Sequence, residues 1–234
     1  MTTAIEAGQL LLLLNWMSPA FPIGSFAYSH GLEWAIEEGQ VTSAAGLKSW
    51  IEDIIIRGSG WNDAVLFARV WQDNAGKLNE LALALSSSKE RYLETTQLGA
   101  AFEIAASFFP FPPPLAGEVA RHAPEGGLAA RGGGKVCAYP IAAGLACKAM
   151  GIDKSLALLS FLQGFSNALV SVAVRLVPLG QTAGLETIRG LMPVIIATAT
   201  RAATASLDDL GSAAIAADIA SMKHETQYSR VFRT

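Results

Sequence analysis

Hydrophobic residues recur at helical spacing along most of the chain. The clearest stripe stands at i, i+3, i+4, i+7 and i+8 and consists of Leu47, Trp50, Ile51, Ile54 and Ile55. Such a stripe predicts an amphipathic helix from about residue 44 to residue 57, because these positions share one helical face. The Gly-Ser-Gly run at 58–60 would end that helix.

Three more helices are expected before residue 110. Asn62 and Asp63 can cap the first of them. The second carries leucines at helical spacing, at Leu78, Leu81 and Leu85. A longer helix follows a run of three serines and would extend from Lys89 to about Phe109.

A last helix is expected near the C-terminal end of the sequence. Ser206 and Asp209 have the spacing of a capping box, which marks a helix start. The apolar face that follows would carry Ile215, Ile219 and Met222. Alternating strand patterns do not last beyond a few residues, so the predicted fold class is all-α.

One segment, residues 110–134, interrupts the helical pattern. It is rich in Pro and Gly and contains few bulky side chains. Such a segment cannot bury enough apolar surface to offset the entropy of ordering it. We therefore expect a single helical domain over residues 1–234, a bundle of about eight to ten helices with one disordered loop at about 110–134.

Charged residues make up 16% of the chain, whereas ordinary soluble domains contain about 25%. The net charge of −3 offers no basic excess, so we expect no nucleic-acid partner. The low charge has two possible explanations. Either the chain enters a membrane, or part of its apolar surface is covered by another protein.

The uncharged stretch at 155–174 is long enough to span a membrane. It contains Gln163 and Asn167, whose amides are costly in hydrocarbon unless they are paired. We interpret it as a core helix and expect no membrane contact. The leucine run at 10–14 has no positive charge before it and no cleavage site after it, so it is interpreted as a helix of the mature protein.

The two cysteines, Cys137 and Cys147, form no CxxC motif and have no histidine at ligand spacing. A zinc or redox site is therefore not expected, and both side chains are predicted to be buried. Two cysteines without a secretory signal are typical of a reducing compartment, so we expect a cytoplasmic protein.

Templates for catalysis fail on this sequence. The GGGKV run at 132–136 lacks the first Gly and the Ser or Thr of a phosphate loop. The GFSNA run at 164–168 lacks the final Gly of a nucleophile elbow and lies in a helical pattern. With three histidines, no set of nucleophile, base and orienting group can be assembled. We expect no enzyme and no cofactor.

Two of the three histidines need comment as metal ligands. His30 and Glu33 have i, i+3 spacing, but two ligands do not close a site. We expect a solvent-facing pair there and no metal site. A direct nickel carrier that uses His30, His224 or a cysteine is kept as an alternative function.

Two segments have the residue composition of contact surfaces. Residues 18–33 place Phe21, Phe26 and Tyr28 among prolines and glycines, and aromatic side chains on a fixed backbone make good interface anchors. A kinked connector packed on its own core is the alternative for this segment. The tail at about 223–234 mixes aromatic and arginine side chains, which are enriched at interfaces, and is predicted to dock.

Three stretches resemble the urease accessory protein F family. They are AFPIGSFAYSHGLE at 20–33, NALVSVAVRLVPLGQTAG at 167–184 and ADIASMKHETQYSRVFR at 217–233, and they stand in the order of the family. The resemblance covers the chain from about residue 10 onward.

The resemblance implies an all-helical homodimer, without a cofactor of its own, that works in assembly of the nickel centre of urease. It would bridge the accessory GTPase, protein G, and accessory protein D, called H in some organisms, which contacts apo-urease. Nickel would pass through the assembled complex. GTP would be bound by the partner GTPase, and the chain would regulate GTP hydrolysis by that partner. A membrane-associated helical protein is the other alternative.

The resemblance also assigns candidate residues. The partner-binding set is Phe21, Phe26, Tyr28, His30, Glu33, Tyr228, Ser229, Arg230 and Phe232. Arg230 would be the arginine that contacts the partner, in a tail that stays mobile until the partner orders it. The VRLxPLGQ block, with Arg175, Pro178, Leu179, Gly180 and Gln181, would belong to the core, the dimer or the GTPase-facing region.

Overall fold

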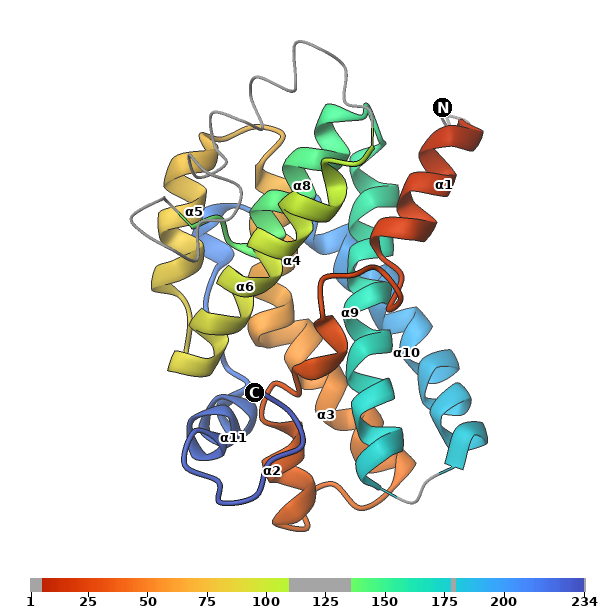
Figure 1. Cartoon of the computed structure of the whole chain (residues 1–234), viewed down its shortest axis with the longest axis vertical. Coiled ribbons are helices and arrows are strands. Elements are labelled where there is room, and N and C mark those ends of the chain that lie inside the picture. The colour runs from red at the N-terminus through yellow and green to blue at the C-terminus, as the bar shows by residue number, and fades with distance from the viewer. Residues whose placement is uncertain (1–5, 110–135, 178–179, 234) are drawn as a thin grey trace.

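The computed structural model describes residues 6–109, 136–177 and 180–233 (Figure 1). Helices, turns and bends account for the regular structure of these residues, and no strand occurs among them. The all-α fold class is therefore confirmed. The loop expected at 110–134 lies outside the described residues, as do Pro178 and Leu179 of the VRLxPLGQ block.

Short connections join most of the elements, apart from the long stretch between α6 and α8. In chain order they are α1 (Ala7–Trp16), η1 (Ser25–Ala27), α2 (Leu32–Glu37), α3 (Ala44–Arg57), α4 (Ser59–Arg69), α5 (Ala75–Ala84), α6 (Lys89–Ala106), α8 (Tyr139–Ala149), α9 (Lys154–Leu176), α10 (Gly180–Ala202), η2 (Leu207–Asp209) and α11 (Ile215–His224). Figure 1 shows the long helix α9 running through the molecule beside α10, with α11 and α2 together at one end.

Helix α9 is the central element, and it contains the stretch whose length suits a membrane span. It packs against α10, α4, α2 and α3, and half of its most apolar window is buried in the structure. The Gln163 Nε2 amide donates to Asn167 Oδ1 at 2.9 Å, so the two amide side chains are paired by one hydrogen bond. The prediction of a core helix at 155–174 is confirmed.

Aromatic side chains fill the core on both sides of α9. Phe161 stacks on Phe67 of α4 with ring centroids 4.8 Å apart. Trp16 meets Phe102 edge to face at 5.8 Å, which joins α1 to α6. Such ring pairs add to the free energy gained from burying apolar area alone.

Capping side chains mark the starts of several helices. Helix α3 has the bounds that its apolar stripe predicts, and the Ser43 hydroxyl caps it by accepting from the Gly46 amide at 3.2 Å. Asn74 and Ser88 cap α5 and α6 in the same way. The last described turn of α6 ends at Ala106, slightly before the predicted end.

The start of α4 was predicted wrongly. The helix begins at Ser59, inside the glycine run expected to separate two helices, and Gly58 is its N-cap. Asn62 is not a cap, because its Oδ1 accepts from the Gly211 amide at 2.9 Å. A Cβ at Gly58 would lie 2.8 Å from the Ala214 side chain, so close packing explains this glycine.

The last helix also differs from its prediction. The capping box of Ser206 is present, but it closes only the short turn η2, and α11 starts later. The apolar stripe of α11 faces solvent, with Ile215 67%, Ile219 46% and Met222 49% exposed. The helix instead buries small and polar residues, Ala220, Ser221 and His224.

Both cysteines are free and buried, as predicted. Burial raises the pKa of the Cys137 and Cys147 thiols, which keeps them protonated and unreactive near neutral pH.

Replacing Phe161 by Ala should remove the centre of the core. We expect Phe161→Ala to lower the free energy of unfolding by about 3–5 kcal/mol, because a large buried ring leaves a cavity. Chemical denaturation followed by circular dichroism measures it. The matched control is Phe108→Ala, whose ring is 85% exposed and should change stability little; equal losses for both variants would contradict this account of the core.

Stability should also depend on pH through Glu103. Burial raises the pKa of this carboxyl from 4.5 to about 7, with a hydrogen bond from Cys137 partly opposing the rise. The folded state therefore binds a proton that the unfolded state has lost, and stability falls as the pH increases between about 4.5 and 7. Glu103→Gln should reduce this fall, measured as denaturation midpoints at both ends of the range; an unchanged slope would refute it.

Candidate functional site

The first and the last of the three motif stretches meet where α11 approaches the start of α2. Gly31 has a positive φ of 74°, and a Cβ built on it would lie 2.4 Å from the Ser221 main-chain nitrogen. Only glycine permits this approach. The Ser221 hydroxyl then reaches the Ser88 hydroxyl at 2.7 Å, which links α11 to the first turn of α6.

A buried row of charged groups lies beneath this contact on α6. The Glu94 carboxylate pairs with His30 Nε2 and with Arg91 Nη1, both at 2.7 Å. Arg91 also reaches Asp63 Oδ2 at 3.2 Å. Burial by itself would raise the pKa of Glu94, but the charges of Arg91 and His30 hold it at about 2. Glu94 is therefore ionised at any physiological pH.

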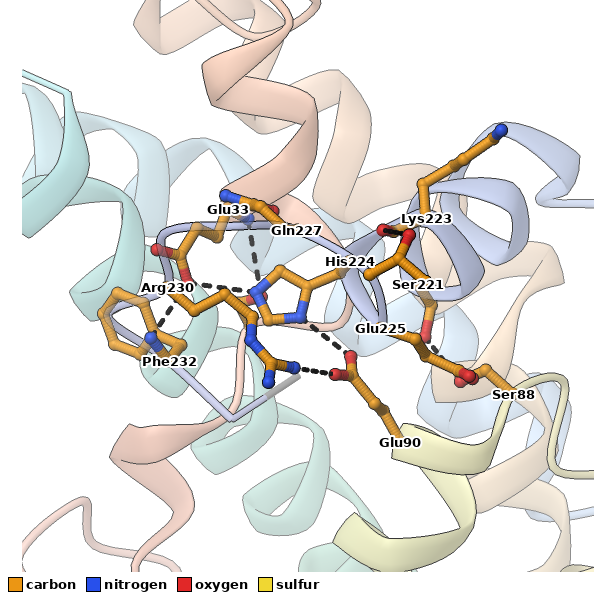
Figure 2. Close-up of polar contacts among 12 residues, drawn as sticks. Glu33, Ser88, Glu90, Ser221, Lys223, His224, Glu225, Gln227, Arg230 and Phe232 are labelled. Carbon is orange, nitrogen blue, oxygen red and sulfur yellow. Dashed lines mark hydrogen bonds and ion pairs between the residues drawn. The ribbon is translucent and has the colours of Figure 1, made fainter.

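A second buried cluster surrounds His224, the last residue of α11 (Figure 2). Its Nδ1 lies 2.8 Å from Glu90 Oε2 of α6, and its Nε2 lies 3.1 Å from Glu33 Oε2 of α2. The ring is fully buried. These two contacts join three helices that are far apart in sequence.

The expectation of a solvent-facing pair at His30 and Glu33 is wrong. His30 is 7% exposed and Glu33 is 5% exposed. They belong to different clusters, because His30 bonds to Glu94 while Glu33 bonds to His224. The positive φ of 52° at His30, followed by Gly31, turns the chain and separates the two side chains.

Residues 225–233, called the C-terminal segment below, fold back over this cluster. The Val231 amide donates to Glu33 Oε1 at 2.7 Å and the Phe232 amide to Glu33 Oε2 at 2.9 Å. The Arg230 guanidinium pairs with Glu90 Oε1 at 2.8 Å. The tail expected to be mobile until a partner orders it thus lies against its own chain.

Two more contacts fix the end of the C-terminal segment. The Arg233 amide donates to the Ala27 carbonyl at 2.7 Å, and its Nη1 lies 3.3 Å from Gln97 Oε1. Tyr28 donates to the same Gln97 oxygen at 2.7 Å. The C-terminal segment is therefore bonded to the 18–33 stretch as well as to α6.

Arg175, at the end of α9, brings in the second motif stretch. Its guanidinium carbon lies 5.8 Å from the Phe26 ring centroid and 6.0 Å from that of Phe232. These are cation–π distances. One cation thus stands between an aromatic ring of the first stretch and one of the third, so all three stretches form a single surface.

The nine candidate partner-binding residues fall into two groups. Five are buried: Phe21, Tyr28, His30, Glu33 and Phe232. The other four, Phe26, Tyr228, Ser229 and Arg230, are exposed. Phe21 packs on Phe102 at 5.6 Å, away from the C-terminal segment. Gly180 and Gln181 are exposed at the start of α10.

Sequence reasoning missed the part played by α6. Glu90, Arg91 and Glu94 are buried, and Gln97 anchors two side chains. The sequence does contain a signal for this cluster. Arg91 and Glu94 lie on the same helical face as Leu98 and Phe102. Charged residues that continue an apolar stripe indicate a buried ionic cluster.

Apolar side chains are exposed on three further helices. Besides the α11 stripe, they lie on α1 at Leu10, Leu11 and Leu14 and on α10 at Leu185, Met192 and Ile196. An open groove between α1 and α6 is lined by residues that include Leu14, Ile104 and Phe108. Within the described ranges, His, Cys, Asp and Glu do not gather in any group of three or more that could hold a metal ion.

Comparison with known proteins gives a consistent result. The UreF family model matches residues 41–192. The urease accessory protein UreF of Mesorhizobium japonicum is 44% identical over 239 residues and covers the whole of both chains. UreF 1 of Brucella canis is 44% identical over 96% of this chain and 94% of its own. UreF of Rhodopseudomonas palustris is 42% identical over 99% and 95%.

The close approach at Gly31 can be tested directly. Gly31→Ala should destabilise the protein by about 1–3 kcal/mol, because the new Cβ would overlap the α11 backbone. Faster tryptic cleavage of the C-terminal segment should accompany this loss. Gly24→Ala is the matched control, since Gly24 also has a positive φ, of 78°, but open space around it. Equal effects of the two substitutions would show that backbone strain alone is responsible.

Proposed function

The chain belongs to the UreF family of urease accessory proteins, and on this premise we propose that it is a non-catalytic chaperone of urease maturation. In this role it joins the accessory GTPase, protein G, to accessory protein D/H and supports nickel incorporation into apo-urease. One observation carries the proposal: the three motif stretches, separate in sequence, form one surface around Arg175 and the C-terminal segment.

The exposed part of that surface suits the scaffold partner, accessory protein D/H. Tyr228 is fully exposed, and Phe26 is 48% exposed beside the Arg175 guanidinium. Aromatic and arginine side chains on an ordered backbone contribute strongly to protein interfaces. Val231 and Arg230 add an apolar and a cationic group. The Val231 amide is held by Glu33, and the Arg230 guanidinium is held by Glu90.

Arg230 contacts its own chain and also faces solvent. Its side chain is 41% exposed, although one nitrogen is paired with the buried Glu90. A guanidinium has five donors, so the remaining ones are open to a partner carboxylate or carbonyl. Arg230 is thus both an anchor of the C-terminal segment and the arginine proposed to contact the partner.

The other proposed partners need apolar contact area, which the exposed stripes of α1, α10 and α11 provide. Large apolar patches on soluble proteins commonly mark interaction sites. We assign these stripes together to a second copy of the chain and to the GTPase. GTP belongs to that partner, and nickel is cargo of the assembled complex. Two free thiols and no disulfide among the described residues are in keeping with a cytoplasmic role.

Removing exposed side chains of the surface should weaken scaffold binding without unfolding the chain. We expect the double variant Phe26→Ala, Tyr228→Ala to lose about 2 kcal/mol or more of binding free energy toward accessory protein D/H. Calorimetry or a quantitative pull-down measures the loss. Tyr92→Ala is a matched control, since Tyr92 is an exposed aromatic residue on α6 outside this surface.

The larger proposal is tested by reconstitution. The chain should co-purify with the accessory GTPase and accessory protein D/H together, and omitting it should leave urease without nickel. Failure of a well-folded chain to capture either protein, or full nickel loading in its absence, would refute the proposal.

A further inference from the structure

His224 occupies an unusual position in the structure. Its ring is completely buried, and each ring nitrogen meets a carboxylate oxygen, Glu90 Oε2 at 2.8 Å and Glu33 Oε2 at 3.1 Å. Figure 2 shows the ring between these two side chains, with the C-terminal segment passing beside it. A neutral imidazole has one N–H, whereas two ionised carboxylates can only accept hydrogen bonds.

Two ionised carboxylates, one at each ring nitrogen, are both satisfied only when each nitrogen carries a proton. Glu33 accepts two main-chain N–H groups and Glu90 accepts the Arg230 guanidinium, and these contacts favour the ionised carboxylates. An imidazolium ring satisfies both contacts. A neutral ring would turn one lone pair toward a carboxylate oxygen in a buried site, where such an encounter is costly.

The same two carboxylates hold the C-terminal segment. Glu33 binds the amides of Val231 and Phe232, and Glu90 binds Arg230. We propose that His224 is a protonation-dependent positioning residue: the imidazolium fixes Glu33 and Glu90 so that they dock the C-terminal segment, and loss of its proton releases that segment. This inference rests on the proposed function in one respect, since the docked segment is what presents Tyr228 to the scaffold partner.

Other charged groups near the ring have their own partners. On α2, Glu37 pairs with the Gln227 amide. On α6, the Lys89 main-chain amide donates to Glu225 Oε1 at 2.8 Å, so the charge of Glu225 lies at the N-terminus of α6. Lys223 points away from the ring in Figure 2. Among the described residues, Glu33 and Glu90 are the charged side chains paired with the ring, and Arg230 pairs with Glu90.

His30 provides a contrast within the same molecule. Its Nε2 lies 2.7 Å from Glu94 Oε1, but its Nδ1 lies 3.4 Å from the Ser59 hydroxyl. A hydroxyl can donate as well as accept, so neither protonation state of His30 leaves that contact without a hydrogen. We therefore expect protonation of His224, and not of His30, to control whether the C-terminal segment is docked or released.

The test measures amide exchange of Val231 and Phe232 in the wild-type chain by NMR, corrected for the intrinsic effect of pH. Protection should fall by about tenfold or more between the pH at which both ring nitrogens carry a proton and the higher pH at which only one does. The ring nitrogens of His224 should both be protonated at the lower pH by their ¹⁵N shifts. Flat protection, or a neutral ring beside a protonated carboxyl, would overturn the proposal.

Glu90→Gln supplies the matched variant. A glutamine amide can donate to a neutral Nδ1 or accept from a protonated one, so the second proton is no longer required. We expect lower protection of the C-terminal segment, through the lost Arg230 ion pair, and a pH dependence at least threefold smaller than in the wild type. Far-UV circular dichroism confirms folding. A full wild-type pH dependence in this variant would overturn the proposal.

Scaffold binding separates this inference from the proposed function. Affinity of the wild-type chain for accessory protein D/H should fall about tenfold over the same pH range, in parallel with protection. Binding that stays constant while the C-terminal segment loosens would overturn the link between docking and recognition. No binding at any pH, with protection still following pH, would refute the proposed function and support the switch.

Discussion

The structure around the C-terminal segment depends on one constraint: a charge removed from water must be paired. Glu33, Glu90 and Glu94 are all buried, and each meets a histidine or an arginine. None of these pairings is local in sequence except Arg91 with Glu94. Because losing these pairings would leave buried charges uncompensated, the positions of α2, α6 and α11 are tied to one another more strictly than apolar packing alone would require.

The same constraint bears on the low content of charged residues. Part of an already small set of charges is used inside the protein, so the surface holds fewer than the composition suggests. Leucines on α1, Met192 on α10 and Ile219 on α11 are left in contact with solvent. The core therefore does not account for all of the apolar composition, and the proposed function assigns the remainder to faces covered by other proteins.

Features decided within a few residues could be predicted from the sequence. The bounds of α3 and the Ser88 cap follow from local spacing and local hydrogen bonds. The start of α4 and the exposed face of α11 could not be predicted, because they depend on contacts such as that between Gly58 and Ala214. The site was found only in part for the same reason: resemblance indicated its residues, but burial of the 30–33 pair arises from packing that no local pattern records.

The contacts of His224, Arg230 and Phe232 with the buried glutamates join distant parts of the chain. His224 meets Glu90 across 134 positions and Glu33 across 191, and Phe232 meets Glu33 across 199. Synthesis proceeds from the N-terminus. Glu33 of α2 and Glu90 of α6 are therefore made long before His224 and Arg230, which pair with them. A chain that stops before Arg230 lacks the guanidinium that Glu90 binds and the two amides that Glu33 binds. The proposed partner surface at this site consequently requires a chain synthesised through Phe232.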